Sequence, residues 1–168
     1  PSKNMNELAN KKKISTFTGF FNFETSKKIL KKYGKADVFY GANVFNHVDD
    51  NIGFLSGIYN LLKDDGKLIL EVPDLSSLIK SVGFDTIYHE HRHYYSEKSI
   101  YKILAIKKFY ISKVEKINYM SGSLRIFASK KIVKKNKLFS HVTQKQFLDF
   151  KKKVQIVINT IKEFVVKN

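Results

Sequence analysis

The sequence has no cysteine among its 168 residues, and this absence excludes two kinds of site. Neither a disulfide framework nor a thiolate metal site can form without that residue. A protein without cysteine fits the reducing cytoplasm, so we expect a cytoplasmic location.

Long apolar runs are also missing. No run approaches the roughly 18 residues that a membrane-spanning helix needs. The N-terminal stretch "PSKNMNELANKKK" has no apolar core of the kind found in signal peptides, and no membrane partner is expected. The sequence does not begin with methionine, which predicts that the chain is a fragment of a longer protein.

Arginine is scarce, although the net charge is +16. Only Arg92 and Arg125 accompany 29 lysines, which are spread from Lys3 to Lys167 together with many Asn, Ile, Phe and Tyr residues. Nucleic-acid recognition favours the bidentate fork of arginine, gathered in one patch. The pattern therefore favours the bias of an AT-rich coding sequence over nucleic-acid binding. A lysine-rich binding module without catalytic activity is the weaker alternative.

The composition is that of a globular chain. Hydrophobic residues make up 43% and aromatic residues 14%, well above a disordered sequence. Strand and helix patterns alternate over residues 1–129, which predicts an α/β domain with a mainly parallel sheet and a C-terminal antiparallel hairpin. Helices are expected over 2–13, 22–34, 51–63, 73–83 and 96–107, and strands over 14–17, 36–44, 67–72, 108–117 and 122–129, with a turn at 64–66. Residues 130–168 read as a lysine-rich helical segment that begins a further domain.

The stretch "FDTIYHEHRHYY", residues 84–95, is dense in titratable side chains. His89, His91 and His93 alternate and would share one face of a strand, as a metal site would require. A second interpretation is general acid–base chemistry, in which a histidine exchanges protons, a carboxylate orients it and a tyrosine stabilises an oxyanion. A polar surface loop is the third.

A second group of polar residues follows the predicted strand 36–44. In an open parallel sheet, ligands bind beyond the carboxyl ends of the strands, which places Asn43, Asn46 and His47 at the ligand edge. Taken alone, His47 also fits a surface histidine before a helix. The helix and strand that intervene would return the chain to the same edge, beside residues 84–95.

Six stretches of the sequence together match one pattern, and the run "DTIYHEH" is the most specific part of it. They are "PSKN", "FFNFETSKKI", "YGKADVFYGANVFNHVDD", "LLKDDGKLILEVPDL", "FDTIYHEHRHYYS" and "SGSLRIFA". In these stretches the chain resembles the sugar C-methyltransferases. The resemblance implies a Rossmann-like domain that uses S-adenosylmethionine to methylate carbon 3 of a nucleotide-linked 4-keto-6-deoxy sugar, and a zinc-binding domain outside this chain.

The resemblance also implies roles for individual residues. His91 would be the base that removes the proton from carbon 3, giving an enolate that attacks the methyl group. Tyr88 and Glu90 would complete the catalytic group, and His47 and Asn43 would bind the sugar. Gly19, Phe20 and Asn43 would contact the cofactor.

Some features depart from the family pattern. The glycine-rich cofactor loop, the ribose-binding carboxylate and the cysteine-rich zinc domain are not in this sequence, so we expect the chain alone to bind S-adenosylmethionine weakly or not at all. Residues 120–123 read "MSGS" where the family has His-Gly-Gly-Ser, and Gly19 replaces an acidic residue. Arg92 and His93 stand where smaller or apolar residues are usual. A small-molecule O- or N-methyltransferase of the same fold is the alternative enzyme.

Overall fold

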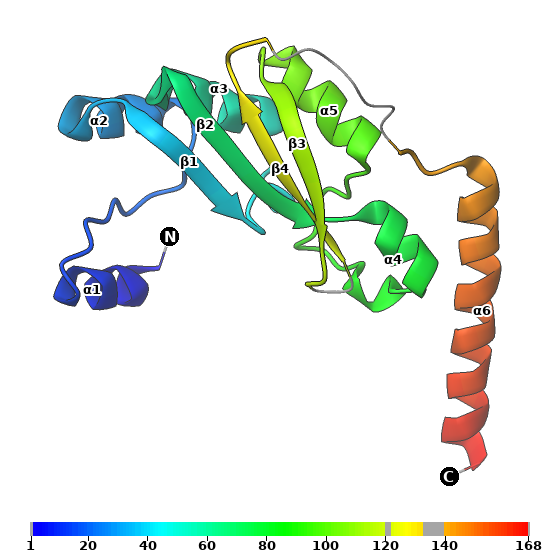
Figure 1. Cartoon of the computed structure of the whole chain (residues 1–168). Coiled ribbons are helices and arrows are strands. Elements are labelled where there is room, and N and C mark those ends of the chain that lie inside the picture. The colour runs from blue at the N-terminus through cyan, green and yellow to red at the C-terminus, as the bar shows by residue number, and fades with distance from the viewer. Residues whose placement is uncertain (1, 120–121, 133–139, 168) are drawn as a thin grey trace.

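The computed structural model describes residues 2–119, 122–132 and 140–167 (Figure 1). The elements follow the alternation that the sequence predicts. In chain order they are α1 (Lys3–Lys11), α2 (Phe23–Tyr33), β1 (Ala36–Ala42), α3 (Asn51–Leu61), β2 (Leu62–Pro73), α4 (Leu75–Ser81), the 3₁₀ helix η1 (Phe84–Thr86), α5 (Glu97–Ile106), β3 (Tyr110–Ile117), β4 (Ser123–Ser129) and α6 (Gln144–Lys167).

The sheet has the strand order β1-β2-β4-β3. β1 and β2 are parallel, whereas β4 runs antiparallel to both of its neighbours, β2 and β3. The α/β class and the C-terminal hairpin are thus confirmed, but the sheet is mixed rather than mainly parallel. The strand predicted over 14–17 is wrong, because that segment has no regular structure: Ile14 is 57% exposed and the Thr16 hydroxyl bonds the side chain of Asn10.

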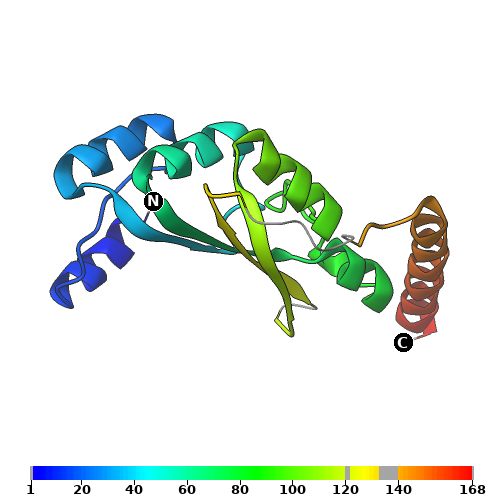
Figure 2. The same cartoon turned by 45° about the horizontal axis from the view of Figure 1, so that its top comes forward.

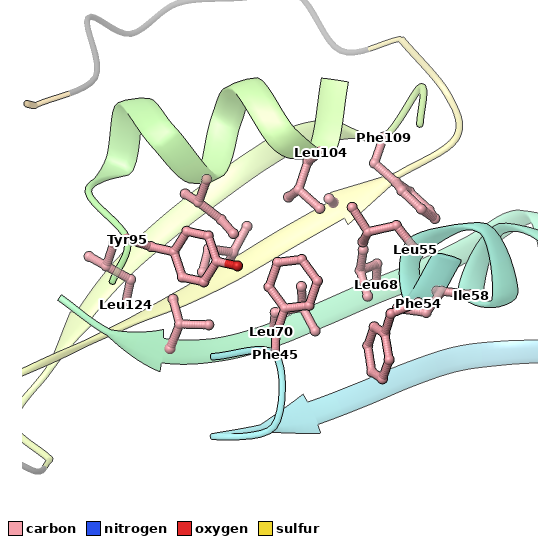
Figure 3. Close-up of a cluster of buried hydrophobic side chains, with 14 of the residues drawn as sticks. Phe45, Phe54, Leu55, Ile58, Leu68, Leu70, Tyr95, Leu104, Phe109 and Leu124 are labelled. Carbon is pink, nitrogen blue, oxygen red and sulfur yellow. The ribbon is translucent and has the colours of Figure 1, made fainter. Parts of the chain in front are cut away.

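The core lies between one face of the sheet and the helices α3 and α5, which cover that face in Figure 2, while α2 packs against α3. β2 supplies its centre, since Leu68, Leu70 and Val72 are fully buried. Figure 3 shows how the side chains of α3 and α5 meet those of the strands. The buried cluster consists of Phe45, Phe54, Leu55, Ile58, Leu62, Leu68, Leu70, Val72, Tyr95, Ile100, Leu104, Phe109, Leu124, Ile126 and Ala128.

The strand predicted to be buried, β1, is half exposed. It lies at an edge of the described sheet, and its Val38 and Tyr40 are 52% and 58% exposed. Its other face packs Phe39 against the core. The prediction of a strand was right and that of burial was wrong, because an apolar run does not reveal whether both faces are covered.

Local side-chain contacts fix where the helices begin. Asp50 accepts the main-chain N–H of Gly53 at 2.8 Å and starts α3, and Ser96 accepts that of Ser99 at 3.2 Å and starts α5. The predicted turn at 64–66 lies within β2, as an irregularity in its register with β1. Gly66 allows it, because a Cβ there would lie 3.0 Å from the carbonyl oxygen of Lys63.

The C-terminal helix begins later than the sequence suggests. α6 starts at Gln144 rather than near residue 130, and residues 133–139 of the predicted segment lie outside the described residues. It contacts α4, and Figure 1 shows the two helices at the same end of the molecule. Among the described helices, α6 included, none is both long and apolar enough to cross a membrane.

Candidate active site

Two loops meet at the carboxyl end of the parallel strands. Residues 43–50 follow β1, and residues 84–95 return to the end of β2, where Leu75 donates its N–H to the carbonyl oxygen of Tyr95 at 2.9 Å. Phe45 of the first loop stacks on Tyr95, with ring centroids 5.4 Å apart. The crossover through α3 therefore brings the two predicted groups of polar residues together.

His91 lies at the centre of this junction and is 9% exposed. Its Nδ1 is 2.9 Å from the carbonyl oxygen of Thr86, and since a carbonyl only accepts, Nδ1 carries the hydrogen. In the neutral ring the lone pair is then on Nε2, where the Tyr88 hydroxyl donates across 3.0 Å. The imidazole is thus held in the tautomer that presents Nε2 as a base.

His47 is the second histidine of the site. Its Nδ1 lies 2.8 Å from the carbonyl oxygen of Glu90 and donates to it, for the same reason. The rings of His47 and His91 are 4.9 Å apart between centroids. The structure therefore brings the predicted substrate residue beside the predicted base.

Further contacts fasten the two loops to each other. The N–H of His93 donates to the carbonyl oxygen of Asn46 at 3.1 Å, and the Nε2 of His93 lies 2.9 Å from the carbonyl oxygen of Val48. Arg92 forms an ion pair of 2.6 Å with Asp49. Arg92 and His93, the two positions that depart from the family pattern, thus connect segment 84–95 to the loop of residues 43–50.

The open side of the junction is polar. A cavity of about 250 Å³ is lined by His47, His89, Glu90 and Arg92. The Glu90 side chain is 65% exposed, and its carboxylate lies 4.0 Å from His89. Tyr88 is 42% exposed. The predicted catalytic residues Tyr88 and Glu90 are therefore both accessible to a ligand.

The alternating histidines do not gather around one point. His91 and His93 bond main-chain carbonyls of different loops, while the side chain of His89 is 89% exposed. In residues 2–119, 122–132 and 140–167, no three His, Cys, Asp or Glu side chains lie where they could hold a metal ion together.

The three predicted cofactor residues differ in how buried they are and in what they offer to a ligand. Asn43 follows β1 with a left-handed φ of 51°, and its buried Oδ1 has no hydrogen-bond partner among the described residues. That orphaned acceptor, at the edge where ligands bind, fits the ammonium group of S-adenosylmethionine. Phe20 is 77% exposed. Gly19 has no side chain, and a Cβ there would lie 3.2 Å from Phe17.

Two residues of segment 84–95 that shape the site, Thr86 and Tyr94, were not among the predicted site residues. The carbonyl oxygen of Thr86 orients His91 and also accepts the hydroxyl of Tyr94 at 3.2 Å. Burial raises the pKa of the Tyr94 hydroxyl, which donates this bond. Every residue has a carbonyl, so only the position of the turn after η1 could have pointed to Thr86.

Comparison with known proteins gives a family. The family model described as "Methyltransferase domain" matches residues 1–109. The chain is also 33% identical over 129 residues to the C-methyltransferase NovU of Streptomyces niveus. That alignment covers 77% of this chain and 31% of NovU, so the chain spans about a third of its relative.

Solved structures of methyltransferases share the fold. One is a SAM-dependent methyltransferase of Thermotoga maritima, described as a possible histamine N-methyltransferase, with a TM-score of 0.55 and 17% identity over 78% of this chain and 71% of that one. Another is a SAM-dependent methyltransferase of Anabaena variabilis, with a TM-score of 0.56 and 15% identity. The match covers 77% of this chain and 65% of that one.

The fold is thus that of the Rossmann-like, S-adenosylmethionine-dependent methyltransferases. The chain belongs to the methyltransferase domain family, as the match over residues 1–109 shows.

Proposed function

We propose that the chain contributes the acid–base site of a C-methyltransferase whose substrate is a nucleotide-linked keto-deoxy sugar, methylated at carbon 3. The observation that carries the proposal is the fixed tautomer of His91, with Nδ1 on the Thr86 carbonyl and the lone pair on Nε2. A carbon nucleophile needs such a base, whereas O- or N-methylation does not need an enolising base. The relative named as a C-methyltransferase supports the same choice.

The first step is proton removal from carbon 3 by Nε2 of His91. The C–H electron pair moves into the enolate, whose negative charge gathers on the ketone oxygen. Tyr88 now donates to Nε2, so its hydroxyl must turn away as the substrate arrives. Its exposed ring has room to do so, and the freed hydroxyl then donates to the ketone oxygen where charge develops.

Neighbouring residues position the sugar and the base. The imidazole of His47, held by the Glu90 carbonyl, and the accessible carboxylate of Glu90 both face the polar cavity and would bind sugar hydroxyls. Asn43 would hold the cofactor through its unpartnered oxygen. S-adenosylmethionine, when bound, supplies an electrophilic methyl group, and His91 retains the proton taken from carbon 3.

The test is exchange of the carbon 3 proton of a 4-keto-6-deoxy sugar nucleotide with deuterated water, followed by NMR. Wild type should exchange it, and His91→Ala should slow exchange by about 10²–10⁴-fold, the usual contribution of a general base. His141→Ala is the matched control, because His141 is exposed and outside both loops. Wild type without exchange would favour O- or N-methylation, and undiminished exchange in His91→Ala would remove His91 as the base.

A further inference from the structure

The hydroxyl of Tyr94 lies against the stretch of main chain that carries both partners of the His91 ring. It donates to the carbonyl oxygen of Thr86 at 3.2 Å. Burial raises the pKa of this hydroxyl, and a main-chain hydrogen bond from Tyr88 lowers it in part. Thr86 supplies the acceptor for Nδ1 of His91, and Tyr88 supplies the hydroxyl on Nε2. One tyrosine hydroxyl is thus bound to the backbone of the two residues that contact the two nitrogens of the imidazole.

The carbonyl oxygen of Thr86 is shared by two donors. Nδ1 of His91 lies 2.9 Å from it and the Tyr94 hydroxyl 3.2 Å, so both of its lone pairs are used. The other end of the same peptide group is held as well, because the N–H of Ile87 donates to the carbonyl oxygen of Phe84 at 3.0 Å. Tyr94 therefore fixes the direction of this carbonyl independently of the ring that the carbonyl orients.

Packing against the core does little to hold residues 86–88. The side chains of Ile87 and Tyr88 are both exposed. Tyr94, in contrast, directly precedes Tyr95, which is buried in the hydrophobic core. The hydroxyl of Tyr94 therefore connects a span with exposed side chains to a part of the chain that the core holds in place.

The direction of the Thr86 carbonyl has a chemical consequence for His91. When that carbonyl turns away, the hydrogen on Nδ1 loses its acceptor, and the neutral ring can carry its hydrogen on Nε2 instead. In that tautomer Nε2 has no lone pair, so it can neither accept the hydroxyl of Tyr88 nor take a proton from a substrate. The position of a backbone carbonyl thus decides whether the ring can act as a base at Nε2.

We propose that Tyr94 is a positioning residue of the site: its hydroxyl holds the main chain of residues 86–88 and so keeps His91 in the tautomer that presents Nε2 as a base. The ring of Tyr94 lies edge to face with that of His91, with centroids 6.1 Å apart, and its hydroxyl acts through Thr86. The use of Nε2 in catalysis rests on the proposed function, whereas the tautomer is a property of the free chain.

The test is nitrogen-15 NMR of the His91 ring in the 168-residue chain at about pH 8, above the ordinary pKa of histidine of roughly 6.5. Wild type should carry its hydrogen on Nδ1. Tyr94→Phe keeps the ring and loses the hydroxyl, so the ratio of the Nδ1–H to the Nε2–H tautomer should fall about fivefold, the change that corresponds to one neutral hydrogen bond. The spectrum of His91→Ala identifies the His91 signals.

Tyr40→Phe is the matched control. It also removes a hydroxyl that makes a side-chain hydrogen bond, at 3.0 Å to Glu71, but Tyr40 lies on β1, outside both loops of the site. Its His91 tautomer should equal that of wild type, and urea denaturation shows how far each variant is destabilised. An unchanged tautomer in Tyr94→Phe would overturn the proposal. An equal change in Tyr40→Phe would overturn it too, because the effect would then be one of general destabilisation.

Exchange of the carbon 3 proton separates this inference from the proposed function. If both hold, Tyr94→Phe should slow exchange in proportion to the lost share of the Nδ1–H tautomer, and by less than His91→Ala does. If wild type shows no exchange, the proposed reaction fails. The tautomer measurement, which needs neither sugar nor cofactor, still decides for or against the role of Tyr94.

Discussion

The Nδ1 of His91 lies 2.9 Å from the main-chain carbonyl oxygen of Thr86, and this contact decides which nitrogen of the ring can act as a base. Because the carbonyl belongs to the backbone at the end of η1, no side-chain substitution at position 86 removes it. The tautomer is thus set by the path of the chain, and mutational tests must address Nε2 and its surroundings.

Tyr88→Phe removes the hydroxyl that donates to Nε2 of His91. If the same hydroxyl polarises the ketone, exchange of the carbon 3 proton should slow by about 10²–10³-fold, as when one oxyanion donor is lost. The assay is NMR exchange in deuterated water. Tyr119→Phe, at another exposed tyrosine, should leave the rate unchanged. An unaltered rate in Tyr88→Phe would show that its hydroxyl takes no part.

His93→Ala removes the ring that bonds the carbonyl oxygen of Val48 and lies 6.1 Å from the Tyr95 ring. We expect a loss of roughly 1–3 kcal/mol in the free energy of unfolding, because a part-buried acceptor loses its donor. His89→Ala serves as the control and should change stability by less than about 0.5 kcal/mol, since its side chain is 89% exposed. Urea denaturation measures both, and equal losses would contradict the loop-fastening role of His93.

Tyr95→Phe tests a buried hydroxyl that accepts the side-chain amide of Asn51 at 2.7 Å. At pH 7 the variant should lose about 1–3 kcal/mol of unfolding free energy, because that buried amide is left without its acceptor.

The difference in unfolding free energy between wild type and Tyr95→Phe should become smaller at alkaline pH. Burial raises the pKa of Tyr95, whereas in the unfolded chain tyrosine ionises near its ordinary value of about 10. Above pH 10 the unfolded state therefore loses a proton that the native state keeps, and wild type is destabilised as pH rises, by up to about 1.4 kcal/mol per unit. Phenylalanine lacks this dependence. Urea denaturation at pH 7, 10 and 11 measures the gap between the two proteins, and a constant or widening gap would refute the explanation.

Arg125→Met tests a charge pair on the face of the sheet opposite the core. Arg125 Nε lies 2.6 Å from Glu71, which is 6% exposed and also accepts the Tyr40 hydroxyl at 3.0 Å. Without the guanidinium, Glu71 is left as a buried charge, and we expect a loss of roughly 2–4 kcal/mol in unfolding free energy. Lys113→Met breaks an exposed pair with Glu115 and should cost no more than about 1 kcal/mol. Similar losses in both variants would argue against burial as the cause.

Local chemistry made much of the fold predictable. Ser2, Asp50 and Ser96 each accept a main-chain N–H three residues later, and such caps can be recognised from the sequence because all partners are near neighbours. The exposure of β1 could not be recognised in this way. Whether Val38 and Tyr40 are covered depends on elements distant in the chain, not on their own apolar character.

In the candidate site, too, some features could be predicted from the sequence and others could not. The crossover rule placed His47 beside segment 84–95, and the rings of His47 and His91 do meet. The partners that orient these rings are main-chain carbonyls of Thr86 and Glu90, which every residue type possesses. Asn46 was expected at the ligand edge, yet it is fully buried, and its carbonyl accepts a bond from His93.

The half-exposed edge strand β1 has a consequence for how the protein behaves in concentrated solution. Its outer backbone edge and the side chains of Val38 and Tyr40 form a template on which a strand of another copy could add. The net charge of +16 opposes such growth by repulsion between copies. Salt shortens the range of that repulsion to about 8 Å at physiological ionic strength. Colloidal stability of this chain should therefore fall as salt is added, with β1 as the point of attachment.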